Sequence, residues 1–302
     1  MTTATTAAAG APAVKTPTTP YCGVVVPMIT PFTPAGGIDE AAIGRVVDHL
    51  VGFGLAGIFP LGTSGESMSI HPDDRRKVVA ATVKHVGGRA MVYAGIPSTC
   101  FRESVDAAAA YQQLGAAAVV AHMPSYYPLN DDEIEGYFLR LADAVRLPVV
   151  LYNIPVTTHH SISLDSLDRL RKHTNIVAIK DSSGDRQRLM EMLERCGGRG
   201  GFPVMVGSSP VFAHGLRHGA IGLVPSGAHI VGDKYQAQFE AAMADRWDEV
   251  ERLQAETDAA VMQYLKGRTV GQGLAVLKAL LEKRGLCGRT MLPPLRDHVG
   301  DV

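Results

Sequence analysis

The chain alternates short apolar runs with longer stretches in which apolar residues recur at helical spacing. From Gly23 onwards, each run is rich in Val, Ile, Ala or Leu and ends in a polar turn. A short apolar run between two turns is typical of a strand that is buried on both faces of a parallel sheet. The sequence predicts eight such strands, at residues 23–28, 57–61, 90–95, 117–122, 148–153, 176–180, 204–207 and 220–225.

Helices are predicted between these strands. Two of them carry clear start signals: Pro72 is followed by two acidic residues, and Asn130 is followed by three. Proline and carboxylates suit the first turn of a helix, and asparagine suits the position before it. The predicted helices include residues 39–53, 72–86, 102–114, 131–145, 164–172 and 186–195.

Eight strand–helix units in about 200 residues match a (β/α)8 barrel, whereas a doubly wound sheet usually has fewer strands and a topological switch. After residue 231 the alternation stops, and three helices are predicted at residues 233–245, 247–265 and 270–283. We therefore expect an α/β protein with a (β/α)8 TIM barrel over residues 21–231 and a C-terminal helical bundle over residues 232–302. Residues 1–20 consist mainly of Thr, Ala and Pro, which predicts a disordered tail.

Composition and charge argue against several classes of function. The 302 residues are 46% hydrophobic and 20% charged, so the chain can bury a large core. Its formal net charge of -1 gives no general attraction to nucleic acids or anionic lipids. No apolar stretch reaches the roughly 18 residues that a membrane span needs. The four cysteines include no C-x-x-C pair, which favours reduced thiols in the cytoplasm over a zinc site or a disulfide framework.

A lysine ends the sixth predicted strand, where a barrel opens towards its ligand. The apolar run 176–179 leads directly into Lys180. Burial disfavours an ammonium group, so a lysine at this position should lose its proton easily and can attack a carbonyl carbon. The alternative is a lysine that only extends to water at a strand end.

Two further strand ends carry groups that suit this chemistry. The turn after the second strand contains Thr63 and Ser64 between two glycines, and its hydroxyl and backbone N–H groups could bind a small carboxylate. Tyr152 lies one strand before Lys180, and residues at one level on adjacent strands are about 5 Å apart. A phenol there can relay protons. Taken alone, the turn is also compatible with a purely structural role, and the tyrosine with packing.

Other motifs fail on their context. Residues 52–57 satisfy G-x-G-x-x-G, but they follow a predicted helix and precede a strand, which is the reverse of the dinucleotide-binding arrangement. His214 and His218 are four residues apart, yet no H-E-x-x-H motif or nearby carboxylate completes a metal site. We therefore expect neither an organic cofactor nor a metal ion.

Together, the motifs at residues 62–66, 152–155 and 179–185 resemble the dihydrodipicolinate synthase / N-acetylneuraminate lyase family in order and spacing. The resemblance extends from about residue 23 to 231, and more loosely through the final helices. It implies a (β/α)8 barrel with a C-terminal helical extension, usually a homotetramer built as a dimer of dimers. It also implies a class I aldolase that acts on pyruvate or other 2-oxo acids without a metal or cofactor.

The resemblance also implies a role for individual residues. Lys180 would form an imine with the C2 carbonyl, and Tyr152 would be the general acid/base. Thr63 and Ser64 would hold the carboxylate, and Thr63 would also link Tyr152 to Tyr126. Tyr126 matches the family tyrosine that reaches into a neighbouring subunit's site, although the adjacent Tyr127 leaves this register open by one residue. The other expected substrate-binding residues are Gly62, Thr157, Ser182, Gly207, Ser208 and Ser226.

Two departures from the family's patterns bear on the second substrate. Thr157 stands where a dihydrodipicolinate synthase would carry the arginine that binds a second carboxylate, and Ser208-Ser209 replace the Asp-Glu pair of a sialic-acid lyase. A neutral hydroxyl cannot replace a bidentate guanidinium. We therefore favour an aldolase for a 2-keto-3-deoxy sugar acid or a similar 4-hydroxy-2-oxo acid. The alternatives are 4-hydroxy-tetrahydrodipicolinate synthase, a dehydratase of the same family and a non-catalytic 2-oxo-acid-binding protein.

Overall fold

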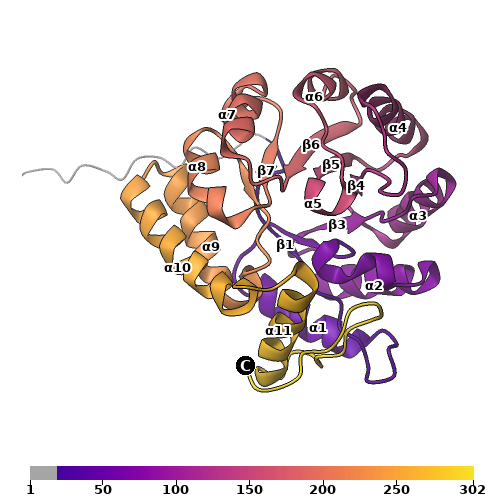
Figure 1. Ribbon diagram of the computed structural model, residues 1–302, viewed down its shortest axis with the longest axis vertical. Helices are drawn as coiled ribbons and strands as arrows, with labels where there is room; N and C mark the ends of the chain where they lie inside the picture. The colour runs from indigo at the N-terminus through magenta and orange to yellow at the C-terminus, as the bar shows by residue number, and fades with distance from the viewer. Residues whose placement is uncertain (1–18) are drawn as a thin grey trace, which may run out of the picture.

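The computed structural model describes residues 19–302, so most of the expected tail at residues 1–20 lies outside the described residues. Eight parallel strands form a closed barrel in sequence order, and helices surround it (Figure 1). This arrangement confirms the predicted (β/α)8 TIM barrel and all eight predicted strands. The strands are β1 (Gly23–Pro27), β2 (Gly57–Phe59), β3 (Met91–Gly95), β4 (Ala118–His122), β5 (Val149–Asn153), β6 (Ile176–Asp181), β7 (Val204–Val206) and β8 (Gly222–Leu223).

The outer helices cover the sheet, and each predicted one matches to within two residues at both ends. Both start signals act as expected: Pro72 opens α2, and Asn130 forms a capping box with Glu133. The helices are α1 (Glu40–Val51), α2 (Pro72–Val86), α3 (Phe101–Leu114), α4 (Asp131–Ala144), α6 (Leu164–Leu170) and α7 (Arg186–Arg195). Two short helices that we did not predict are α5 (Pro155–Thr158) and α8 (Phe212–Arg217).

Side chains inside the barrel form a core of their own, separate from the core between sheet and helices. The inner core includes Val25, Phe59, Tyr93, Val150 and Met205. Because side chains alternate along a strand, the inward positions of neighbouring strands meet in levels across the barrel. One level contains His122, Tyr152, Lys180 and Met205, which the strand register pairs in this order.

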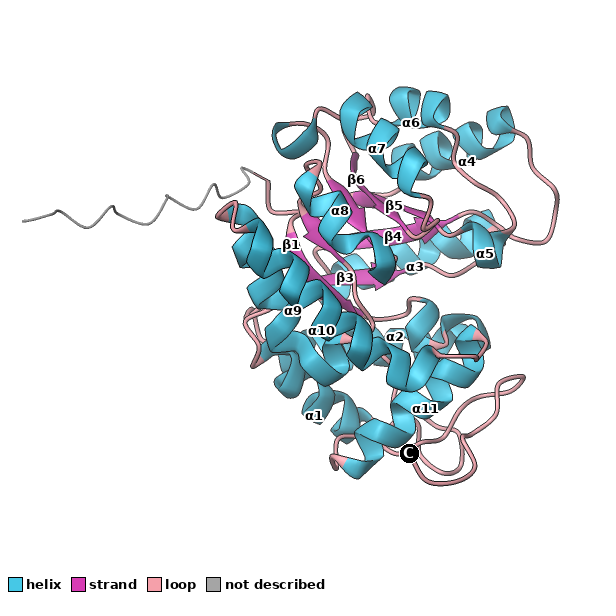
Figure 2. Cartoon of the chain, turned by 60° about the vertical axis from the view of Figure 1, so that its left-hand side comes forward, coloured by secondary structure: helices cyan, strands magenta, loops and turns pink. Residues whose placement is uncertain are grey.

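The C-terminal helices are α9 (Ala228–Met243), α10 (Trp247–Leu265) and α11 (Val270–Lys283), and the last two have the predicted bounds. α9 begins five residues before the predicted start at 233, and its backbone is non-helical at Val231, with φ -137° and ψ 50°. Figure 2 shows α9 and α10 packed side by side against the barrel. Among the described residues, no helix is long and apolar enough to cross a membrane.

Candidate active site

Lys180 and Tyr152 lie in contact at the C-terminal end of the barrel. They are register partners on the adjacent strands β6 and β5, so both side chains point to the interior at one level. The Lys180 Nζ is 3.7 Å from the centre of the Tyr152 ring and 4.9 Å from the centre of the Phe59 ring. Both residues are buried, with exposed fractions of 5% and 4%. The predicted proximity of the two side chains is confirmed.

Burial and mutual contact change the protonation of this pair. Burial lowers the pKa of the Lys180 amine, and the neighbouring Tyr152 offsets only part of this effect. Burial would raise the pKa of the Tyr152 phenol, but the charge of Lys180 and the surrounding hydrogen bonds bring this pKa below its ordinary value. Those hydrogen bonds involve Lys180, Thr63 and Ser182. The amine is therefore more readily neutral, and hence more nucleophilic, than a surface lysine.

The loop after β2 brings a hydroxyl to this pair. Thr63 opens a short 3-10 helix (Thr63–Gly65), and its Oγ1 lies 3.5 Å from the Tyr152 Oη. The loop is held in place because Thr30 Oγ1 donates to the Gly65 carbonyl at 2.8 Å.

The same loop passes close to an aromatic ring of the barrel interior. A Cβ at Gly62 would lie 2.9 Å from the Phe59 ring, so a glycine is needed there for the close approach. Ser64 is half-buried on the same loop.

A buried ion pair holds the next residue of this loop. Glu66 has a left-handed backbone, with φ 54°, and its carboxylate contacts the Lys278 ammonium from α11. Neither side chain is exposed. Lys278 Nζ also donates to the Thr290 carbonyl at 2.8 Å, and the Leu292 N–H donates to Glu66 Oε2 at 2.9 Å. The C-terminal helix and the segment after it are thus tied to the loop that carries Thr63.

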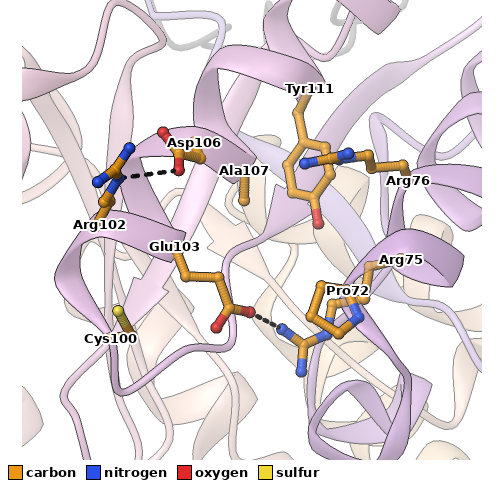
Figure 3. Close-up of a pocket in the computed structure, with 9 residues that line it drawn as sticks. All are labelled: Pro72, Arg75, Arg76, Cys100, Arg102, Glu103, Asp106, Ala107 and Tyr111. Atoms are coloured by element: carbon orange, nitrogen blue, oxygen red, sulfur yellow. Dashed lines mark hydrogen bonds and ion pairs between the residues drawn. The ribbon is translucent and has the colours of Figure 1, made fainter.

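A surface cavity of about 270 Å³ lies between α2 and α3, and one of its lining residues, Arg75, also contacts the segment that continues the Thr63 loop (Figure 3). Arg75 connects the two: its Nε donates to the Ser67 carbonyl at 3.1 Å, and its NH1 contacts Glu103 at 2.7 Å. None of the predicted site residues lines this cavity.

Two other cavities flank the Lys180–Tyr152 pair. The first, which we term the Thr63 cavity, measures about 320 Å³ and is lined by Thr63, Glu66, Ser67, Met68, Ser69, His122, Ser125, Thr157, Thr158, Pro294 and Leu295. The second, the Ser208 cavity, measures about 480 Å³ and is lined by Gly207, Ser208, Ser209, Pro210, Phe212, Pro225, Ser226, Gly227, Tyr235, Asp258, Val261, Met262 and Leu265. No Lys or Arg occurs among the described residues that line either cavity.

Gly207 places the Ser208 cavity next to the lysine. A Cβ on Gly207 would lie 2.9 Å from Lys180 Cε and 2.1 Å from Ser182 Oγ. A glycine is therefore the one residue that lets the chain pass so close to both side chains. Gly207 is thus both a lining residue of this cavity and a neighbour of Lys180.

A model of the dihydrodipicolinate synthetase family matches residues 20–299. The chain belongs to this family. A 4-hydroxy-tetrahydrodipicolinate synthase of Pelobacter propionicus is 29% identical over 282 residues, which cover 93% of this chain and 94% of the relative. An uncharacterized DapA-like lyase of Halobacterium salinarum is 32% identical over 275 residues, covering 91% and 88%.

Solved structures agree with the family assignment. The dihydrodipicolinate synthase of Bacteroides thetaiotaomicron aligns with a TM-score of 0.87 at 28% identity, covering 93% of this chain and 94% of that one. A pyruvate complex of the Acinetobacter baumannii synthase aligns with a TM-score of 0.84 at 24% identity, covering 92% and 94%, which shows the shared fold. Members of the dihydrodipicolinate synthetase family are class I aldolases or lyases that form a Schiff base with a lysine. This chain is therefore an enzyme of that class.

Four of the other expected substrate-binding residues are divided between the two cavities, whereas Gly62 and Ser182 line neither. Thr157 lines the Thr63 cavity, whereas Gly207, Ser208 and Ser226 line the Ser208 cavity. The structure therefore does not bring Thr157 to Ser226. The Thr157 hydroxyl donates to the Ile154 carbonyl at 3.3 Å, and Ser226 Oγ is hydrogen-bonded to the Tyr264 hydroxyl at 2.8 Å.

Within a single chain, Tyr126 does not contact Thr63. The side chains of Tyr126 and Tyr127 are 81% and 69% exposed, and their rings lie 5.0 Å apart. Both tyrosines project from the loop after β4.

Our sequence analysis overlooked His122, which lies at the level of Tyr152 and lines the Thr63 cavity. Burial lowers the pKa of its imidazole; the contact with the Met123 carbonyl opposes this, and the charge of Lys180 adds to it. The side chain is thus held neutral, 6.5 Å from the Tyr152 ring between ring centres. The signal was present in the sequence, because His122 ends the fourth predicted strand.

The histidines that we considered for a metal site lie apart from this centre. His214 and His218 are near each other, with ring centres 4.4 Å apart. In the part of the chain that the structure describes, no group of three or more His, Cys, Asp or Glu side chains could hold a metal ion.

Proposed function

We propose that this enzyme is a pyruvate-dependent aldolase that cleaves or forms a 4-hydroxy-2-oxo acid, specifically a 2-keto-3-deoxy sugar acid. One observation carries the choice within the family: a buried lysine that contacts a tyrosine lies between two cavities whose described lining has hydroxyls but no Lys or Arg. A second carboxylate in such a cavity would lack a positive partner. A hydroxylated aldehyde finds suitable hydrogen-bond partners there.

In this mechanism, neutral Lys180 attacks the C2 carbonyl of the 2-oxo acid, and loss of water from the carbinolamine gives a protonated imine. The imine accepts the electron pair of the C3–C4 bond as that bond breaks, while a base removes the proton of the 4-hydroxyl group. The aldehyde leaves, the enamine takes a proton at C3, and hydrolysis of the imine releases pyruvate. The covalent step and the positioned proton donor together lower the barrier.

Tyr152 is the proposed general acid/base of the imine steps, because its hydroxyl contacts both Lys180 and Thr63. Thr63 would link Tyr152 to the hydroxyl of Tyr126 from a neighbouring chain and so pass protons between them. The hydroxyls of Thr63 and Ser64, with the backbone N–H groups of the loop, would bind the substrate carboxylate. Ser182 contacts Tyr152 and would fix the phenol in place.

A second candidate is 4-hydroxy-tetrahydrodipicolinate synthase, which condenses pyruvate with aspartate semialdehyde. The names of the relatives from Pelobacter propionicus and Streptomyces coelicolor favour it, the latter at 31% identity. In this reading, His159 or an arginine of a partner subunit would replace the charge that Thr157 lacks.

We also propose that the enzyme works in the cytoplasm as a homotetramer, a dimer of dimers. The four cysteines are free thiols, which suits a reducing compartment. Several large apolar side chains near the Thr63 cavity are exposed in one chain, namely Met68, Tyr126, Tyr127 and Val156. Such a group of exposed side chains is typical of a protein interface. A neighbouring chain would cover it and bring Tyr126 to Thr63.

A trapping experiment and a substrate panel test the proposal. Incubation with pyruvate and borohydride should give an irreversible mass increase that peptide mapping places at Lys180. Incubation with 2-keto-3-deoxy acids should release pyruvate, which lactate dehydrogenase detects. Release of pyruvate from none of these acids, together with efficient condensation of pyruvate with aspartate semialdehyde, would establish the synthase instead. Binding of pyruvate without trapping would indicate a non-catalytic protein.

A further inference from the structure

Two side chains of α10 that lie one helical turn apart, Gln254 and Asp258, contact the segment that follows β7. Gln254 Nε2 donates to the Ser209 carbonyl at 2.9 Å, and the Ala213 N–H donates to Gln254 Oε1 at 3.0 Å. One turn further on, Asp258 Oδ1 accepts a hydrogen bond from Ser209 Oγ at 3.0 Å. Gln254 alone thus fixes the backbone of this loop at Ser209 and that of α8 at Ala213.

Asp258 therefore has binding capacity that the fold does not use. Its Oδ1 contacts one hydroxyl, and within residues 19–302 its Oδ2 has no hydrogen-bond or ion-pair partner. A carboxylate can accept several hydrogen bonds through its two oxygens. A group with an unused acceptor beside a cavity is suited to contact a ligand.

The position of Asp258 relates this acceptor to Lys180. Asp258 lines the Ser208 cavity, and of the described residues that line it, Asp258 alone carries a charge. The same cavity begins at Gly207, directly beside Lys180 Cε. Its other polar groups are the hydroxyls of Ser208, Ser209, Ser226 and Tyr235. A volume of about 480 Å³ has room for a chain of several carbons.

We propose that Asp258 selects the second substrate of this site. Its free carboxylate oxygen accepts a hydrogen bond from a hydroxyl group on the aldehyde portion, and its negative charge rejects an aldehyde that carries a carboxylate. The substrate class is thus a polyhydroxylated aldehyde without an acidic group. This inference rests on the proposed function and extends it to a residue on the C-terminal helices.

The acceptance of a hydroxylated aldehyde and the rejection of a carboxylated one have separate physical causes. A hydrogen bond to a charged acceptor is stronger than one between neutral groups. A second carboxylate would meet a like charge and, among the described lining residues, no cation to compensate it. The ammonium group of aspartate semialdehyde could contact Asp258, but the carboxylate on the same carbon would then remain unpaired in the cavity.

The test compares the full-length enzyme with D258N. D248N is the matched control, because Asp248 is an exposed residue in the first turn of the same helix. Condensation with pyruvate is measured for glyceraldehyde, which has hydroxyls; propanal, which has none; and succinic semialdehyde, which has a carboxylate. For D258N, kcat/KM for glyceraldehyde should fall about 10- to 100-fold, as expected for the loss of a charge-assisted hydrogen bond. Propanal should be unaffected, and succinic semialdehyde should react faster.

Trapping with pyruvate and borohydride is measured in parallel for every variant. Equal trapping in the unmodified enzyme, D258N and D248N shows that the lysine chemistry is intact. Equal changes for all three aldehydes, or no change for any, would overturn the role of Asp258 while leaving the proposed function untouched. An absence of trapping in the unmodified enzyme would instead overturn the proposed function and this inference with it. Should D258N not fold, D258S removes the charge with a smaller side chain.

Discussion

The ammonium group of Lys278 contacts the carboxylate of Glu66 in a place where neither side chain meets solvent. The pair joins α11 to the loop that presents Thr63, although the two residues are 212 positions apart in the chain. The conformation of this loop therefore depends on contacts with the docked C-terminal helix.

Replacing Lys278 by Met should strongly destabilise the enzyme. The change leaves the Glu66 carboxylate buried without its cation, and breaking a buried pair in this way costs about 3–5 kcal/mol. Chemical denaturation measures the free energy of unfolding. The matched control is E282Q, which removes the partly exposed pair between Glu282 of the same helix and Arg289 of the segment after it, and which should cost less than about 1 kcal/mol.

The same variant should also weaken substrate binding. Because the loop would bind the carboxylate, the KM for pyruvate should rise more than kcat falls when Lys278 is replaced. A fall in kcat alone, with KM unchanged, would show that the ion pair does not position the loop. Steady-state kinetics at a temperature where both proteins remain folded provides this comparison.

Replacing Tyr152 by Phe should slow the reaction without preventing binding. The change removes the phenol hydroxyl but keeps the ring against Lys180, and loss of a general acid/base typically costs about 10²–10⁴-fold in rate. Pyruvate should still protect the protein against thermal unfolding. The control is Y93F, because Tyr93 lies deeper in the barrel interior and its hydroxyl contacts Met91 Sδ. Unchanged turnover in Y152F would exclude the proposed proton transfer.

The rate of imine formation should rise with pH over a range below the ordinary lysine pKa of 10.5. Burial lowers the pKa of Lys180, and only the neutral amine attacks the carbonyl. As pH falls through the lowered pKa, the amine gains a proton and the rate decreases. The initial rate of borohydride trapping, measured from about pH 6 to 10, reports this titration. A rate that rises only near 10.5 would mean that the amine is well hydrated.

Stability should decrease in mild acid because of His229. Burial lowers the pKa of this histidine from 6.5 to about 4. Its neutral ring accepts from the Ile29 N–H at 3.2 Å and contacts the Ser226 carbonyl at 2.8 Å. Between these two pKa values the unfolded chain binds the proton and the folded one does not, so the free energy of unfolding falls as pH decreases from about 6.5 to 4.

The magnitude follows from the size of the pKa shift. A difference of this size corresponds to about 3 kcal/mol at the acid end. Denaturant titrations at pH 7 and at pH 4.5 measure the effect, and H229N should lose stability at pH 7 but show a smaller further decrease on acidification. An equal acid dependence in the two proteins would assign the loss to other groups.

The sequence was sufficient for the barrel and for the central pair, because both depend on short-range regularities. Alternating apolar and amphipathic segments define the strands, and adjacent parallel strands place Tyr152 beside Lys180 without further information. His122 follows from the same rule. The four-residue α5 and the six-residue α8 are too short to show a helical period.

Other parts of the site depend on tertiary packing and could not be predicted. Glu66 belongs to a motif that we recognised, but its partner lies on α11, far away in the sequence. Asp258 resembles any polar residue on an amphipathic helix until α10 is docked over the loop after β7. The separation of Thr157 from Ser226 likewise depends on how the loops fold over the barrel.

The missing side chain at Gly207 has a consequence for how this enzyme can diverge. The space that a single methyl group would occupy is already filled on one side by the aliphatic part of Lys180 and on the other by the hydroxyl of Ser182. One added carbon at position 207 would displace both the Lys180 side chain and the Ser182 hydroxyl. New specificities can therefore arise through substitutions in the parts of the Ser208 cavity far from Lys180, whereas position 207 tolerates no residue larger than glycine.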